Sequence, residues 1–121
     1  MVLVTSNHLK QLLFVSYIGV VSPQDLERSR ADLVLLLAEM KPGFSLLVDL
    51  SQITSMGLNC VDEVGRNMEL FDQHGVDLVV RVIPDPYKDI GMNILTIFHY
   101  HHRPRVVTCD NMTEGANAVF A

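Results

Sequence analysis

Tryptophan is absent from this 121-residue sequence, and only two cysteines occur in it. Two cysteines are too few for a disulfide framework or a structural zinc site. Both Cys60 and Cys109 stand among apolar neighbours, and we interpret them as small core residues. Charged residues interrupt every apolar run well before the roughly 18 residues that a membrane span needs. The sequence therefore predicts a globular protein without a transmembrane helix.

Basic residues are also few. Nine Lys and Arg stand against fourteen Asp and Glu, which gives a formal net charge of −5. An excess of negative charge repels phosphate backbones, so nucleic acid is not expected as a partner, and anionic membranes are disfavoured. The N-terminus lacks a basic region followed by an apolar stretch and a cleavage site, which predicts a cytoplasmic protein. The length is that of one domain, and we expect residues 1–121 to form it.

Glycine and proline occur singly, where elements are expected to end. Ser22, Pro23 and Asp25 predict a helix start, with a hydroxyl at the N-cap and a carboxylate at the third position. Lys41-Pro42-Gly43 ends that helix, and Gly75 stands where a left-handed cap would end a later one. These positions divide the chain into nine elements.

The order of the elements defines the fold class. Strands are expected at 2–5, 12–21, 44–50, 76–83 and 105–108, with helices after the second, third, fourth and fifth of them. Strand–helix–strand crossovers require parallel neighbours. The pattern β-β-α-β-α-β-α-β-α therefore predicts an α/β sandwich, with a mixed, mostly parallel sheet of about five strands covered by four helices. Ligands of such sheets usually bind beyond the C-terminal ends of the strands.

The segment from Asp49 to Cys60 carries the most informative polar residues, and we expect a loop at 51–57. The hydroxyls of Ser51, Thr54 and Ser55 and the amide of Asn59 precede a helix start, where unpaired N–H groups can donate hydrogen bonds to a carboxylate or phosphate. No phosphate-loop or dinucleotide-binding motif is present. The alternative is that these residues form turns, with Asn59 or Ser55 as the helix cap.

A second candidate loop follows the fourth strand, where Asp85 and Tyr87 stand at a helix start. We interpret this loop first as a cap and second as part of a binding surface. Three histidines, His99, His101 and His102, are clustered near the end of the same helix. A metal site would need further ligands, and the alternative is a favourable interaction with the helix dipole.

The same helix is expected to pack one apolar face, made of Ile90, Ile94, Ile97 and Phe98. A pocket between this helix and the sheet, lined by Met92, Ile94, Phe98 and Tyr100, would bind a small apolar or anionic ligand; the alternative is simple core packing. No nucleophile motif or paired acid and base is found. We expect neither an enzyme nor a cofactor.

The order of elements and Asp49-Leu50-Ser51 resemble STAS domains, the family of bacterial anti-sigma-factor antagonists (SpoIIAA-like proteins) and of the cytoplasmic tails of sulfate transporters. In that family, a strand ending in D-L-S is followed by D-S-[ST]-G at the start of the next helix, which ends at a glycine. Matched without gaps, that motif falls on the residues 57–60, that is Gly57, Leu58, Asn59 and Cys60. Gly75 matches the glycine that ends the helix.

This resemblance implies a regulatory protein that binds a protein partner, such as an anti-sigma factor or a related kinase. Together with the two loops considered above, the binding residues we expect are Ser51, Thr54, Ser55, Gly57, Asn59, Asp85 and Tyr87. Asn59 takes the place of the phosphorylated residue and cannot accept a phosphoryl group, so the phosphorylation switch is expected to be absent or displaced to Ser55. The alternative function is binding of a small-molecule or lipid-like ligand. A homodimer is also considered, because the strand at 12–21 is expected near a sheet edge.

Overall fold

The computed structural model describes residues 1–120, except for the side chains of residues 86–90. The elements occur in the predicted order: β1 (Val2–Asn7), β2 (Leu12–Val21), α1 (Pro23–Ala38), β3 (Ser45–Met56), a short 3₁₀ turn η1 (Leu58–Cys60), α2 (Val61–Gln73), β4 (Leu78–Val82), α3 (Pro86–His99), β5 (Arg105–Cys109) and α4 (Met112–Phe120). None of the described helices combines the length and the apolar character that a bilayer span requires.

The five strands form one mixed sheet in the order β1-β2-β3-β4-β5. β1 is antiparallel to β2, and every other neighbouring pair is parallel, which confirms the predicted mixed and mostly parallel sheet. β1 occupies the edge and pairs with β2 from Leu12 to Tyr17, so the strand at 12–21 is the second from the edge of the sheet. A homodimer through this edge stays a prediction.

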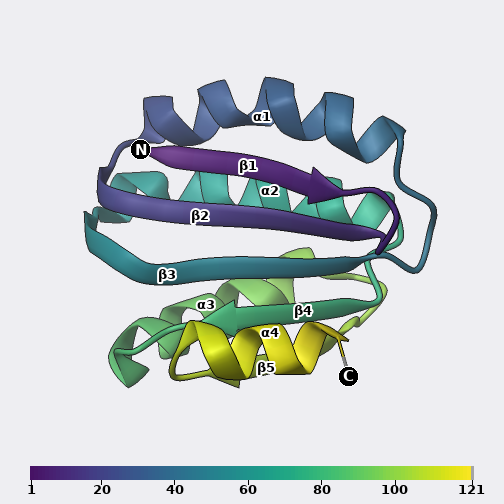
Figure 1. Ribbon diagram of the computed structural model, residues 1–121. Coiled ribbons are helices and arrows are strands. Elements are labelled where there is room, and N and C mark those ends of the chain that lie inside the picture. The colour runs from purple at the N-terminus through teal and green to yellow at the C-terminus, as the bar shows by residue number, and fades with distance from the viewer. Residues whose placement is uncertain (121) are drawn as a thin grey trace.

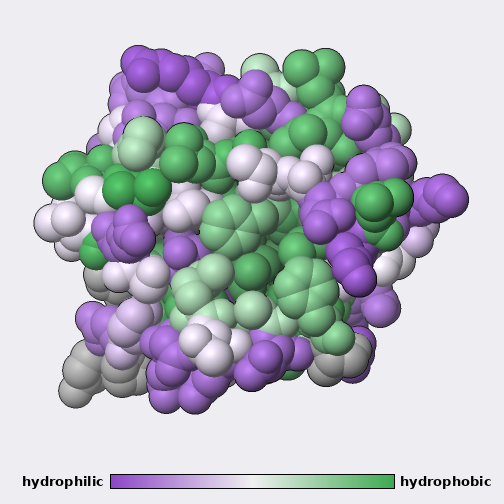
Figure 2. Space-filling view, viewed as in Figure 1, coloured by the Kyte–Doolittle hydropathy of each residue, from purple (hydrophilic) through white to green (hydrophobic). Residues whose placement is uncertain are grey.

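Helices cover both faces of the sheet (Figure 1). α1, α2 and α3 pack on one face, where Leu13, Leu46 and Val79 belong to the larger core. α4 packs on the opposite face against β3, β4 and β5. A Cβ at Gly115 of α4 would lie 2.7 Å from Cγ2 of Val82, so only glycine allows this close approach. The remainder of that face keeps an apolar area over β1 and β2, to which Leu3 contributes (Figure 2).

The predicted start of α1 and the predicted end of α2 are confirmed in detail. Ser22 Oγ accepts a hydrogen bond from the backbone N–H of Asp25, and the Asp25 carboxylate accepts one from the backbone N–H of Ser22. Beyond α2, Gly75 has a φ of +83°, in the left-handed region that favours glycine. Its carbonyl accepts a 2.7 Å hydrogen bond from the backbone N–H of Gly43, which joins the two helix ends.

One strand is much longer than the sequence predicted. β3 continues to Met56, so residues 51–56 extend a strand where we expected a loop. β2 is ten residues long and supplies backbone partners for this extension, from Ile18 opposite Gln52 to Val21 opposite Met56. Two β-bulges interrupt the register along this stretch. β4 pairs with β3 only as far as Asp49, so the extension projects past its neighbour.

The prediction of which apolar face of α3 packs in the core is also wrong. Ile94, Ile97 and Phe98 are 52%, 77% and 66% exposed. The packed face instead carries buried Met92 and half-buried His99, which lie against the sheet and α2. Apolar residues occur on both faces of this helix, and spacing alone does not say which face meets α2.

Candidate binding site at the C-terminal edge of the sheet

The 3₁₀ turn between β3 and α2 presents its apolar residue outward. Leu58 is 91% exposed, whereas Cys60, two residues later, is 1% exposed. The Cys60 thiol donates to the carbonyl of Val21 at 3.4 Å, and its backbone N–H donates to the carbonyl of Gly57 at 3.0 Å. Burial raises the pKa of the Cys60 thiol, which keeps the donor protonated at neutral pH. Cys60 therefore fixes the turn to the end of β2 and leaves Leu58 in solvent.

Asn59 lies on the exposed side of the same turn. Its Oδ1 is 3.8 Å from the Cys60 sulfur, and a Cβ at Gly57 would lie 2.7 Å from that oxygen. The Asn59 side chain is thus folded back over Gly57. No side chain caps the turn or the start of α2, so the alternative in which Asn59 or Ser55 is the helix cap is wrong.

The structure brings most of the predicted binding residues into one segment. All five of the predicted binding residues in this segment are exposed, namely Ser51, Thr54, Ser55, Gly57 and Asn59. The first three stand on the β3 extension, and the other two stand in or next to the turn.

The remaining two predicted residues stand elsewhere. Asp85 is half-buried and precedes α3, beyond the C-terminal end of β4. Tyr87 belongs to α3, and its side chain lies outside the described residues.

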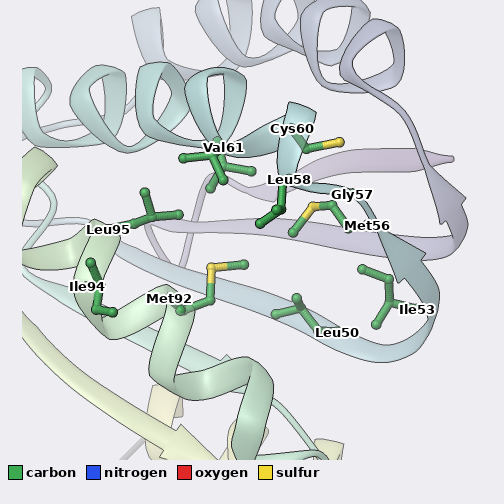
Figure 3. A pocket seen from close by; sticks show the side chains of 12 residues that line it. Leu50, Ile53, Met56, Gly57, Leu58, Cys60, Val61, Met92, Ile94 and Leu95 are labelled. Carbon is green, nitrogen blue, oxygen red and sulfur yellow. The ribbon is translucent and has the colours of Figure 1, made fainter.

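An apolar pocket of about 490 Å³ opens beside this turn (Figure 3). Leu50, Ile53 and Met56 of β3 line one side of it, and Met92 and Leu95 of α3 line another. Leu58, Val61 and Ile94 also contribute to its wall and are exposed at its rim. We call this space the apolar pocket.

The prediction of a pocket against α3 is correct for only part of its lining. Met92 and Ile94 contribute to the apolar pocket. Phe98 instead points to solvent, and Tyr100 is 5% exposed within the core. Burial raises the pKa of the Tyr100 hydroxyl, so this group stays neutral. The exposed orientation of Phe98 could not be read from its spacing in the helix.

The clustered histidines do not converge on one point. His99 Nδ1 lies 3.1 Å from Glu69 Oε1, and His102 Nδ1 lies 2.8 Å from Asp72 Oδ2. Both carboxylates belong to α2, so these histidines attach the end of α3 and the residues after it to α2. His101 is exposed. Across the part of the chain that the structure describes, no three His, Cys, Asp or Glu side chains could hold a metal ion together.

Sequence reasoning missed one polar cluster near the start of α2. Glu63 forms an ion pair with Arg30 of α1 and a 3.3 Å one with Arg66. Arg30 Nε also donates to Asn67 Oδ1 at 3.0 Å. The hydrogen bond from Arg30 holds the pKa of Glu63 below its usual range. Because Arg30 is more than thirty residues from Glu63 and Asn67, no local pattern could reveal its place in this cluster.

Comparison with known proteins gives a consistent account of the fold. No family model and no curated protein matches the sequence. Among solved structures, an uncharacterized DUF3478-family protein with a SpoIIAA-like fold, from Shewanella loihica PV-4, superimposes with a TM-score of 0.67 at 13% identity, over 98% of this chain and 92% of that one.

Two further solved structures are anti-sigma factor antagonists. SpoIIAA in its unphosphorylated form gives a TM-score of 0.65 at 15% identity, over 100% of this chain and 99% of that one. An antagonist from Mycobacterium paratuberculosis gives 0.62 at 16% identity, over 100% and 94%. The chain therefore has a SpoIIAA-like, STAS-type fold, as its resemblance to that family implied.

Proposed function

We propose that this protein is a non-enzymatic regulatory module that binds a protein partner at the C-terminal edge of its sheet. The binding surface, here called the edge surface, consists of Thr54, Ser55, Leu58, Asn59 and Val61. The observation that carries the proposal is the 91% exposure of Leu58 on a turn whose next-but-one residue, Cys60, is buried. A large apolar side chain held outward by a fixed turn is a ready contact for another protein.

The surroundings of Leu58 support a surface rather than an isolated apolar residue. Val61 is 39% exposed and lines the same pocket as Leu58. Val20, which pairs with Ser55, is 67% exposed. The hydroxyls of Thr54 and Ser55 and the amide of Asn59 are also exposed. Apolar contacts among neutral polar groups are typical of protein interfaces.

The structural neighbours indicate the class of partner. Two of them are anti-sigma factor antagonists, and they share only the fold with this chain. By analogy, the partner is an anti-sigma factor or a related kinase. Asn59 has no hydroxyl, so phosphorylation at that position does not control binding, and a phosphorylation switch would require another hydroxyl, such as that of Ser55.

A pair of exposed leucines supplies the test. Leu58→Asp places a charge in the edge surface, whereas Leu9→Asp changes a 95% exposed leucine in the turn between β1 and β2, at the opposite end of the sheet. A partner is first identified by photo-crosslinking from position 58 and then purified. Central interface residues contribute about 2 kcal/mol or more, so we expect Leu58→Asp to weaken its affinity about thirtyfold.

Leu9→Asp should change this affinity less than twofold in calorimetric titration. Equal affinities of the two variants for the purified partner would contradict the proposal. Retained thermal stability of both proteins shows that the loss is not caused by unfolding.

A further inference from the structure

The apolar pocket has the dimensions of a ligand site. Its volume of about 490 Å³ lies within the roughly 300–1,000 Å³ found for small-molecule sites, and it is many times the roughly 30 Å³ share of one liquid water. Protein interiors are packed closely and contain few voids much larger than a water molecule. Because it opens to solvent beside Leu58 and Ile94, the space between β3, α2 and α3 is a surface pocket and not a void within the packed core.

The lining defines the chemistry of what fits. Among the described residues that line the pocket, none carries a charge and none has an aromatic ring. The walls are leucine, isoleucine and valine side chains, with Met56 and Met92 on opposite sides. Methionine is flexible and adapts to irregular apolar shapes. Because these described lining residues offer no ring for stacking and no charge for pairing, the pocket suits a saturated, flexible chain.

The opening of the pocket indicates how such a chain enters. Leu58 and Ile94 are 91% and 52% exposed at the rim, so the pocket communicates with solvent. The exposed carboxylate of Asp62 follows Val61, and the net charge of the chain is −5. Both disfavour an anionic group at the rim. A neutral head group can remain in water while the chain occupies the pocket.

We propose that the apolar pocket binds the aliphatic chain of an uncharged small amphiphile. Burial of methylene groups against Leu50, Met56 and Met92 supplies the affinity, because each buried CH₂ group leaves water. The pocket shares Leu58 and Val61 with the edge surface, but its remaining lining lies outside that surface. Either function can be present without the other, and the two experiments use different molecules.

The test uses 1-decanol as the probe and two isoleucines of α3 as the variants. Ile94 contributes to the pocket wall, whereas Ile97 is 77% exposed and is not part of the lining described. Methyl resonances of the pocket residues should shift on titration with 1-decanol. Ile94→Asp should raise the dissociation constant for 1-decanol at least tenfold, and Ile97→Asp should change it less than twofold. Decanoate should bind more weakly than 1-decanol.

Three outcomes would overturn the proposal. Methyl resonances that stay unchanged with 1-decanol would show that the pocket does not bind this probe. If a purified protein partner shifts them instead, the pocket receives a side chain of that partner. An equal loss of 1-decanol affinity in both variants would place the probe on the exposed apolar residues of α3, Ile94, Ile97 and Phe98, and not in the pocket. Binding of decanoate as tight as or tighter than that of 1-decanol would contradict the proposal that the head group is uncharged. Because Ile94 is already half-exposed, its substitution should leave the fold intact. Val61→Trp narrows the mouth of the pocket and should also weaken the binding of 1-decanol.

Discussion

Gly65 of α2 and His99 of α3 approach so closely that a Cβ at position 65 would lie 2.5 Å from the imidazole Nε2. The other ring nitrogen of His99 is 3.1 Å from Glu69 of α2. The imidazole is therefore held over the glycine by a carboxylate one turn further along the same helix. This contact fixes the position of α3 beside α2 and, with it, one wall of the apolar pocket.

Gly65→Ala should destabilise the protein. Alanine favours a helix by about 1 kcal/mol over glycine, but displacement of a His99 ring held by Glu69 costs about 1–3 kcal/mol, so the net loss reaches about 2 kcal/mol. Gly91→Ala is the matched control, because its Cβ would meet nothing within 4 Å. Urea unfolding should show a lower midpoint for the first variant and an equal or higher one for the second. An equal increase of the urea midpoint in both variants would contradict the packing of His99 against Gly65.

Asp72 predicts a dependence of stability on pH. Burial by itself raises the pKa of this carboxyl, but the hydrogen bonds it accepts from the backbone and ring of His102 outweigh burial and hold the pKa below the ordinary 3.8. A lowered folded pKa gives stability that is complete above 3.8 and is lost as the pH falls through the folded value.

Asp72→Asn should therefore lower the free energy of unfolding by about 1–3 kcal/mol at neutral pH. The difference from the unmodified protein should shrink below pH 4 in urea titrations at fixed salt. His101→Ala, at an exposed neighbour of His102, serves as the control and should follow the unmodified protein. A difference that stays constant into acid would show that the ionised carboxylate is not the cause.

The two thiols should be unreactive in the folded protein. Cys60 and Cys109 are 1% and 7% exposed, and burial raises the pKa of both. Only the thiolate reacts rapidly with alkylating reagents. Mass spectrometry after treatment with iodoacetamide at pH 8 should show no modification without denaturant and two additions in concentrated urea. Rapid native labelling of Cys60 would mean that the turn at 58–60 opens readily.

Asn59→Asp tests whether the edge surface tolerates charge. A carboxylate there adds to the negative charge of nearby Asp62, and we expect the affinity for the purified protein partner to fall at least fivefold. Asn117→Asp makes the same change at an exposed position of α4, on the opposite face of the sheet, and should leave the affinity unchanged. Calorimetric titration measures both. Equal affinities would exclude Asn59 from the interface.

Local patterns predicted the elements well where neighbouring residues decide them. The start of α1 depends on Ser22 and Asp25, three residues apart, and the end of α2 depends on the freedom of Gly75 to adopt positive φ. The start of α4 is similar, because Asn111 Oδ1 accepts from the backbone N–H of Glu114 at 2.9 Å. Each of these signals lies within one turn of chain.

The sequence by itself determined the α/β class, the order of the elements and the exposed polar residues that follow the central strand, because hydrophobic periodicity and turn chemistry act over a few residues. Tertiary structure alone decided that β3 extends to Met56, that α3 turns Ile97 and Phe98 outward, and that a pocket remains beside Leu58. These features depend on the length of β2 and on the contact of His99 with Gly65. Such contacts join residues far apart in the chain, where no local pattern records them.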